Sequence, residues 1–204
     1  MRIITRLAVA LSVVGILPTP GLGQLGERSL TVSGHYAFET GEPFSAIKTV
    51  ALRTVEVTLA FRVYSGSAWT VDIPVSVVPV AWVINNALDS TYFRNGRWWI
   101  FNPARATSHG VGVKPIGVRV GRSIGATALQ VGLSGGLVHF DRPTPGANSS
   151  RLNALGDLDL ELRVPLHGRV AGIVGYRFSH ISNARTGAVN PAIDSHMLSL
   201  GIQR

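Results

Sequence analysis

The sequence predicts an all-β fold, an eight-stranded antiparallel up-and-down transmembrane β-barrel. Three observations lead to this prediction: an N-terminal segment with the layout of an export signal, alternating apolar residues along most of the chain, and connections that alternate between short and long. The composition agrees with it, because only 15% of the 204 residues are charged. Soluble domains usually carry charge on nearer a quarter of their residues.

The first two dozen residues have the layout of a secretory signal peptide. Arg2 and Arg6 give a positive start, residues 7–16 are continuously apolar, and prolines then precede small residues suited to cleavage. The apolar run is short for a helix that spans a bilayer. We therefore expect residues 1–23 to be removed and residues 24–204 to form a single barrel domain. An uncleaved N-terminal anchor is the alternative.

Period-two alternation predicts the strands that follow. In residues 54–63, valine, leucine and phenylalanine occupy one face, while threonine, glutamate and arginine share the other. Residues 157–164 alternate in the same way. At Pro115 the apolar phase slips, which predicts a β-bulge. The eight strands are expected near residues 29–38, 48–64, 68–82, 110–122, 126–140, 152–165, 168–180 and 194–203.

The connections favour a membrane barrel over a soluble one. They are tight after the second, fourth and sixth strands, at residues 65–67, 123–125 and 166–167, whereas the longest of the others runs from about 83 to 110. Short turns at one rim and long loops at the other are typical of outer-membrane barrels. A closed, even set of strands also leaves no unpaired backbone in lipid. Alternation alone does not identify the inward face, so a soluble barrel or sandwich stays open as the alternative.

The charge indicates an anionic partner. The formal net charge is +8, which suits either nucleic acid or a phosphate-bearing membrane surface. The basic residues are scattered and form no nucleic-acid motif, so we expect membrane lipids as partners and no nucleic acid. The chain has no cysteine, and its six histidines show no metal-ligand spacing. We therefore expect neither a metal nor a cofactor.

The last predicted hairpin carries polar residues on its apolar face. His180 and Ser182 continue the apolar row of one strand, and Asp194 begins the apolar row of the next. With both termini on the periplasmic side, these three residues converge on the lipid-facing wall at the depth of the outer leaflet. Ionisable groups in such a position are costly and indicate a function.

Serine, histidine and an acid are the residue types of a nucleophilic hydrolase. Neutral His180 can take the proton of Ser182, and the carboxylate of Asp194 can orient the imidazole. Asn183 and Asn190, in the intervening loop, are candidate donors to an oxyanion.

Neighbouring residues offer alternative assignments. His196 is a rival base, and Ser195 is a rival nucleophile that its place on the inward face disfavours. A histidine and a serine at a barrel rim are also common as ordinary polar residues of that rim.

A family signature matches this hairpin. The residues HISNA at 180–184, followed by Asn-Pro at 190–191 and then Asp194, resemble the signature of the lipid A 3-O-deacylase family, also called acyloxyacyl hydrolases. Residues 110–117 and 135–145 are similar to related members as well, so the resemblance covers most of the mature chain. Only the last hairpin is specific.

The resemblance implies an eight-stranded barrel in the bacterial outer membrane that removes an ester-linked acyl chain from lipid A. It assigns His180 as base, Ser182 as nucleophile and Asp194 as the orienting acid. It places Asn183 or Asn190 near the oxyanion. Two departures stand out: the acid is aspartate where the best-known members have glutamate, and Ala192 stands where the family often has glycine.

Lipid A, or lipopolysaccharide, in the outer leaflet is then the expected partner. Four loop arginines are candidates for contact with its phosphates, with ordinary loop charge as the alternative: Arg94, Arg97, Arg105 and Arg185. Three other functions stay open. These are a non-catalytic barrel with a structural, adhesion or transport role, a phospholipase or acyltransferase that acts on another lipid, and a soluble lipid carrier. The oligomeric state is also open, a homodimer included.

Overall fold

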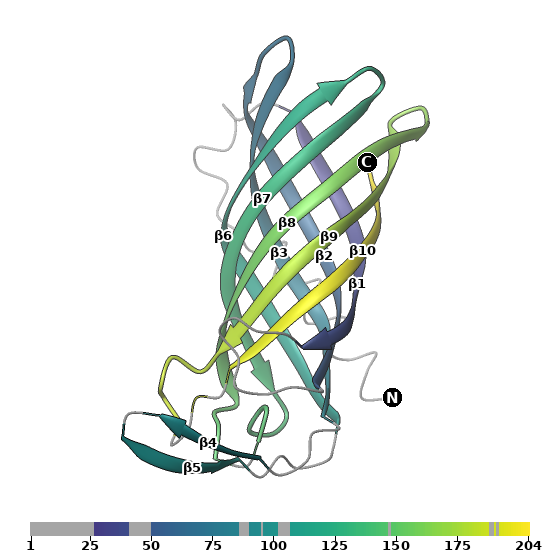
Figure 1. The fold of residues 1–204 in the computed structure, drawn as a ribbon. Helices are drawn as coiled ribbons and strands as arrows, with labels where there is room; N and C mark the ends of the chain where they lie inside the picture. Colours follow the sequence, from purple (N-terminus) through teal and green to yellow (C-terminus); the bar gives the residue numbers. More distant parts are fainter. Residues whose placement is uncertain are drawn as a thin grey trace, which may run out of the picture.

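The chain forms the closed, eight-stranded antiparallel barrel that the sequence predicts (Figure 1). The structure, a computed structural model, describes residues 27–40, 50–85, 90–94, 96–101, 107–146, 148–187, 190 and 192–204. The expected signal peptide, residues 1–23, lies outside the described residues. Within the described ranges, no helix is long and apolar enough to cross a membrane.

The barrel strands follow one another around the wall in chain order. They are β1 (Arg28–Thr40), β2 (Val50–Ser65), β3 (Trp69–Asn85), β6 (Thr107–Ile124), β7 (Thr127–Phe140), β8 (Leu152–His167), β9 (Val170–Ser182) and β10 (Ile193–Gln203). The pairing of β1 with β10, in which Tyr36 lies opposite Leu198, closes the barrel. All eight predicted strands are confirmed, and several extend a few residues farther than expected.

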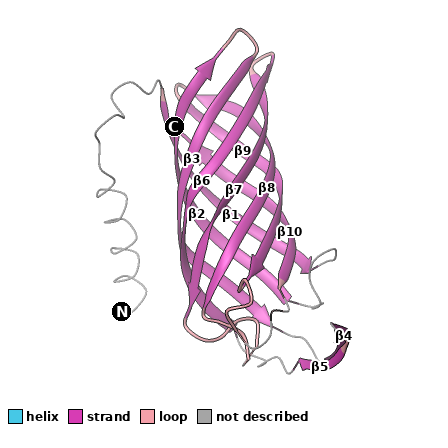
Figure 2. Ribbon diagram, turned by 90° about the vertical axis from the view of Figure 1, so that its left-hand side faces the viewer, coloured by secondary structure: helices cyan, strands magenta, loops and turns pink. Residues whose placement is uncertain are grey.

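The long connection between β3 and β6 contains a hairpin that the alternation analysis missed. β4 (Ser90–Arg94) and β5 (Arg97–Phe101) form a separate two-stranded sheet at the loop end of the barrel, which is the end that carries the long connections (Figure 2). The sequence does carry a signal for it, since Asn-Gly between aromatic segments is typical of a two-residue hairpin turn. Gly96 has a φ of 73°, which glycine adopts without strain.

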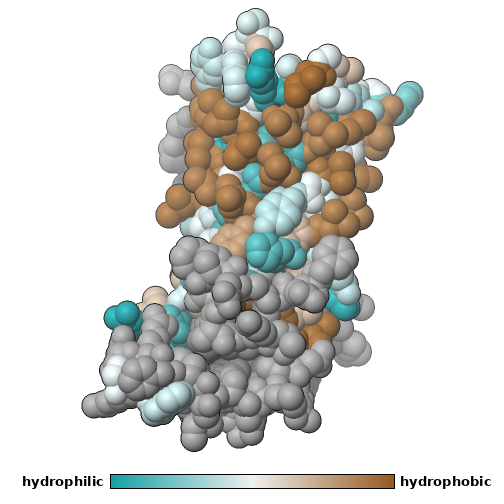
Figure 3. Space-filling view, viewed as in Figure 1, coloured by the Kyte–Doolittle hydropathy of each residue, from teal (hydrophilic) through white to brown (hydrophobic). Residues whose placement is uncertain are grey.

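The orientation of the side chains decides which face of each strand lies inward. Charged and polar side chains fill the interior, whereas apolar side chains form a band on the outer wall (Figure 3). The outward positions include Leu129, Val131, Leu133, Leu158, Leu160, Leu162, Leu198, Leu200 and Ile202, all partly exposed. A soluble barrel has the opposite arrangement, so this pattern identifies a transmembrane barrel with a lipid-facing wall.

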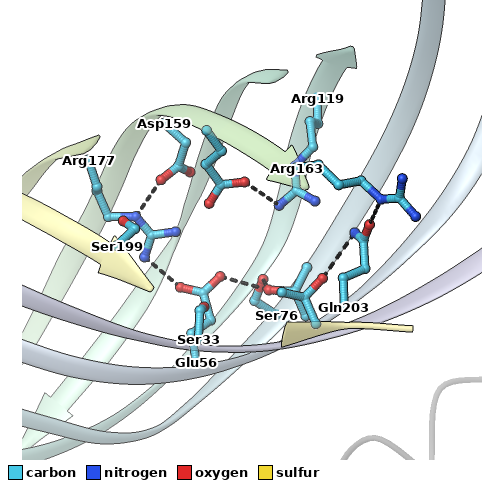
Figure 4. Close-up of polar contacts among 12 residues, drawn as sticks. Ser33, Glu56, Ser76, Arg119, Asp159, Arg163, Arg177, Ser199 and Gln203 are labelled. Carbon is cyan, nitrogen blue, oxygen red and sulfur yellow. Dashed lines mark hydrogen bonds and ion pairs between the residues drawn. The ribbon is translucent and has the colours of Figure 1, made fainter. Parts of the chain in front are cut away.

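Buried ion pairs connect opposite sides of the interior. Lys114 Nζ donates hydrogen bonds to Glu56 Oε2 (2.5 Å) and Asp157 Oδ2 (2.7 Å). Arg177 donates from Nη1 to Glu56 Oε2 (2.7 Å) and from Nε to Asp159 Oδ1 (2.5 Å), as Figure 4 shows. Pairing offsets the cost of burying each charge. Because Arg177 lies on β9, the network also holds the strand that carries His180.

Prolines mark the irregular positions of the wall. The bulge predicted near Pro115 is confirmed, because the register between β6 and β7 shifts between Val113 and Ile116. The register between β3 and β6 also shifts twice, once between Asp72 and Ser76, around Pro74, and once between Val78 and Ala81, around Pro79. Proline has no amide hydrogen for the ladder, so strands accommodate it at such irregularities.

The interior is apolar rather than ionic near the loop end. A buried cluster fills this region, with Leu52, Val78, Val83, Val138, Phe140, Leu155, Ile181, Ile193 and Met197 among its members. Ile181 of β9 lies directly opposite Ile193 of β10. These two side chains are buried in the interior behind the outward-facing pair formed by the adjacent residues, His180 and Asp194.

Candidate active site

His180 and Asp194 form a cross-strand pair on the outer face of β9 and β10. They are directly opposite in the register, and 2.5 Å separates His180 Nδ1 from Asp194 Oδ1. The Asp194 side chain is fully buried, whereas the His180 side chain is 35% exposed. The departure from glutamate therefore does not prevent contact, because the shorter aspartate reaches the imidazole across the strand pair.

Ser182 lies two residues beyond His180 on the same face and is the last residue of β9. Its Oγ accepts hydrogen bonds from Asn190 Nδ2 (2.9 Å) and from the backbone amide of Ala184 (3.2 Å). Asn190 Oδ1 in turn lies 3.2 Å from Ser182 Oγ and accepts a hydrogen bond from the Asn183 amide at 3.1 Å. The Asn190 side chain is thus held beside the hydroxyl of Ser182.

The backbone after Ser182 makes a tight turn in an uncommon conformation. Ala184 and Arg185 have φ values of 49° and 65°, in the left-handed region that non-glycine residues rarely adopt. Strained backbone of this kind concentrates at functional sites. Here it directs the Ala184 amide at Ser182. Sequence reasoning missed this donor, because a backbone amide has no side-chain signal.

The two asparagines occupy different positions. Asn190 contacts Ser182 directly, whereas Asn183 is only 3% exposed and accepts a hydrogen bond from the Arg185 amide at Oδ1 (2.9 Å). The Asn183 carbonyl also accepts from the Thr186 hydroxyl at 2.7 Å. These contacts brace the loop. Of the two predicted oxyanion candidates, the Asn190 side chain is therefore the one that lies against the serine.

Ala192, the second departure from the family pattern, has a backbone conformation that favours glycine. Its φ is 58°, again in the left-handed region. Glycine adopts that conformation without cost, while an L-residue pays roughly 1–2 kcal/mol. The chain keeps the backbone shape for which glycine is suited and carries an alanine there.

The rival residues lie elsewhere. Ser195 is fully buried and faces inward, as the sequence predicted. His196 is on the outer wall, where its Nδ1 shares a hydrogen bond with the Tyr176 hydroxyl and its ring lies 5.4 Å from that of Phe178. The structure thus pairs Asp194 with His180 rather than with His196.

Most of the predicted phosphate contacts have side chains that lie outside the described residues. Arg94 and Arg97 face each other across the tip of the β4–β5 hairpin, and their side chains lie outside the described set. Arg105 is also outside the described residues. Arg185 is exposed, three residues after Ser182. Of these four arginines, Arg185 is therefore the one whose side chain belongs to the described part of the chain, and it follows the serine in the same turn.

The residue types gathered here, an acid–histidine pair and a serine, are those from which a serine hydrolase is built, and the Ser182 hydroxyl itself donates a hydrogen bond to Asn190 Oδ1. A carboxylate on Nδ1 fixes the imidazole tautomer that leaves Nε2 able to accept a proton. Two N–H donors, from Asn190 and Ala184, point at the Ser182 hydroxyl. Donors in that position can also stabilise negative charge that develops next to it.

Comparison with known proteins finds a matching protein family and solved structures with a similar fold. The model of a family described as lipid A 3-O-deacylase (PagL) matches residues 54–203. A crystal structure of the outer membrane enzyme PagL is similar to this chain, with 16% identity and a TM-score of 0.55, over 84% of this chain and 97% of that one. Neisserial surface protein A (NspA) is similar with 12% identity and a TM-score of 0.52, over 86% and 95%. At these identities the two structures show the fold alone. No curated protein sequence matches the chain.

Proposed function

This chain belongs to the lipid A 3-O-deacylase family, and we propose that it is an outer-membrane esterase that hydrolyses the 3-O-linked acyl chain of lipid A. The observation that carries the proposal is the His180–Asp194 pair on the lipid-facing wall, two residues from Ser182. Burying ionisable groups on such a wall costs free energy, so their presence indicates a function. In this proposal the expected signal peptide, residues 1–23, directs export.

The proposed reaction passes through an acyl-enzyme. Ser182 Oγ attacks the ester carbonyl while His180 Nε2 takes its proton, and Asp194 stabilises the imidazolium. Asn190 Nδ2 and the Ala184 amide are the proposed donors to the oxyanion. Collapse breaks the ester bond, and the sugar oxygen leaves with the proton from His180.

Water completes the cycle. His180 takes a proton from a water molecule, which attacks the acyl carbonyl of Ser182. When this second intermediate collapses, the protonated His180 returns the proton to Ser182 Oγ and the fatty acid is released. No step requires a metal or a cofactor.

The position of the site suits a substrate that stays in the bilayer. The candidate residues lie on the lipid-facing wall at the loop end of the barrel, where β9 ends and β10 begins. With the loops at the cell surface, this is the level at which the outer-leaflet acyl chains join their headgroups. The ester bond of a lipid can then reach Ser182 sideways, with its acyl chains still in hydrocarbon.

Mass spectrometry of lipid A tests this function. The chain is expressed in the outer membrane of a host with fully acylated lipid A, beside Ser182→Ala and Ser195→Ala variants. We expect wild type and Ser195→Ala to remove one hydroxyacyl chain, and Ser182→Ala to reduce the rate by at least about 10³-fold. Ser195→Ala is the matched control because it removes the inward-facing serine. Unchanged lipid A beside folded, membrane-located wild-type protein would favour a non-catalytic barrel, or another lipid if the phospholipids change instead.

A further inference from the structure

A second polar feature lies on the outer wall, on strands other than those of the candidate site. Tyr36, Arg53 and Trp82 are direct cross-strand neighbours on β1, β2 and β3. They occupy outward positions, because Leu52 and Thr54, on either side of Arg53 in β2, are buried in the interior. In the register of the wall, a permanently charged arginine is therefore flanked by an aromatic residue on each neighbouring strand.

Tyr36 fixes the position of this guanidinium. Arg53 Nη2 donates a hydrogen bond to the Tyr36 hydroxyl at 3.1 Å, and the guanidinium carbon lies 4.5 Å from the centroid of the Tyr36 ring. Arginine has five N–H donors, and one hydrogen bond leaves the other donors of its two terminal nitrogens for a further partner. Arg53 Nε is buried and has no hydrogen-bond partner among the described residues. An arginine in lipid surroundings needs an anionic or polar partner.

The depth of Arg53 distinguishes it from other outward-facing cations. Among the described barrel strands, the other arginines and lysines on the outer face are Arg28 and Arg122. Both lie at the turn end of the barrel, which is the end with the short connections. Arg53 is near the opposite end, three residues after the first residue of β2, or about 10 Å along the strand. Tyrosine and tryptophan beside it are typical of a membrane–water interface. Arg53 thus lies at the headgroup level of the leaflet on the loop side.

We propose that Arg53, braced by Tyr36, binds a phosphate group of an outer-leaflet lipid. A guanidinium matches phosphate oxygens with two parallel hydrogen bonds, and its stacking on Tyr36 reduces the conformational entropy lost on binding. The surrounding wall is apolar, so the ligand is a lipid phosphate rather than a free one.

The site is separate from the proposed reaction centre. Tyr36 lies opposite Leu198, which follows Asp194 by four residues on β10. The separation between Arg53 and Asp194 is therefore two strand spacings, about 10 Å, across the wall and about 13 Å along it. Phosphate binding at Arg53 consequently does not depend on whether the chain is a deacylase.

Titration of the folded barrel with monododecyl phosphate in dodecyl maltoside micelles tests the proposal by calorimetry. Replacing the charged donor by Arg53→Gln is expected to raise the Kd at least about tenfold. Arg122→Gln is the matched control, because Arg122 also faces outward and lies over an aromatic ring, 5.4 Å from the centroid of Trp69. It is expected to change the Kd less than about twofold. Equal losses in the two variants would mean only general interfacial charge and would overturn the proposal.

Two further arms sharpen the result. Inorganic phosphate is expected to bind at least about tenfold more weakly than monododecyl phosphate, because burial of the alkyl chain is lost. Equal affinity would overturn the assignment to a lipid.

Tyr36→Phe keeps the ring and removes the hydroxyl, so an intermediate Kd is expected. If Arg53→Gln does not fold, Arg53→Lys replaces it as the test, because lysine keeps the charge but lacks the planar guanidinium that makes two parallel hydrogen bonds. It should still weaken binding, and wild-type affinity in Arg53→Lys would contradict the proposal.

Discussion

His180 and Asp194 face each other across β9 and β10, with 2.5 Å between Nδ1 and Oδ1. The contact is made on the lipid-facing side, while the neighbouring residues Ile181 and Ile193 pack into the interior. At this position the two strands therefore carry a polar cross-strand pair on the outer face and an apolar cross-strand pair on the inner face. The backbone hydrogen bonds of the β9–β10 ladder fix the spacing of the strands, and the packed isoleucines hold this part of the ladder against the interior.

Loss of the Asp194 charge should abolish most activity without unfolding the barrel. In Asp194→Asn the carboxamide keeps the size of the side chain but no longer selects the required imidazole tautomer, so we expect kcat to fall by about 10⁴-fold. The measurement is the rate of fatty-acid release from lipid A in mixed micelles. Asp194→Glu, which restores the acid of the family, should retain far more activity. Equal activity of Asp194→Asn and wild type would remove Asp194 from the mechanism.

Asn190 should affect turnover more than substrate binding. Because its Nδ2 lies 2.9 Å from Ser182 Oγ, Asn190→Ala removes one proposed oxyanion donor, and we expect kcat to fall by about 10²–10³-fold with little change in KM. Asn148→Ala, an exposed asparagine of the neighbouring loop, serves as the control and should behave like wild type. A change in KM alone would instead assign Asn190 to substrate binding.

The ionic interior should respond strongly to loss of one partner. Lys114→Met leaves Glu56 and Asp157 without the ammonium group that bonds both, so the free energy of unfolding should drop by about 3–5 kcal/mol. Urea unfolding of the barrel in detergent, followed by gel mobility, measures it. Arg122→Met at the turn end should change stability by no more than about 0.5 kcal/mol. A similar small effect for both variants would show that the network contributes little.

Ala192 should tolerate replacement by glycine. Since its φ is 58°, Ala192→Gly relieves a left-handed alanine, and the free energy of unfolding should rise by up to about 1 kcal/mol while activity is retained. Ala60 is also buried but lies in a regular stretch of β2, so Ala60→Gly should lower stability by about 1 kcal/mol. Parallel thermal melts compare the two variants. Equal destabilisation would mean that the backbone at Ala192 is not strained.

Local sequence signals were sufficient for the strands and for the pairing of His180 with Asp194 on the face that also carries Ser182. Alternation has a period of two in any strand, so the eight barrel strands follow from residue order alone, and the slip at Pro115 marks the bulge. His180 and Ser182 share a face because they are two residues apart, and the antiparallel pairing of β9 and β10 brings Asp194 back to the same end. The β4–β5 hairpin had a comparable local signal in Asn-Gly, but alternation over five residues was too brief to stand out.

Other features depend on the register of strands that are distant in the sequence. The sequence by itself determined the strand pattern, the alternation of faces and the residue types at the last hairpin, because each rests on neighbours along the chain. Only the tertiary structure decided that Glu56 meets Lys114 and Arg177 and that Arg53 lies on Tyr36, and it confirmed the face that the connections predicted to meet lipid. The physical reason is that a pleated strand has two equivalent faces until closure of the barrel places one of them inside. Closure also fixes the register, which then selects the partner of every charged side chain.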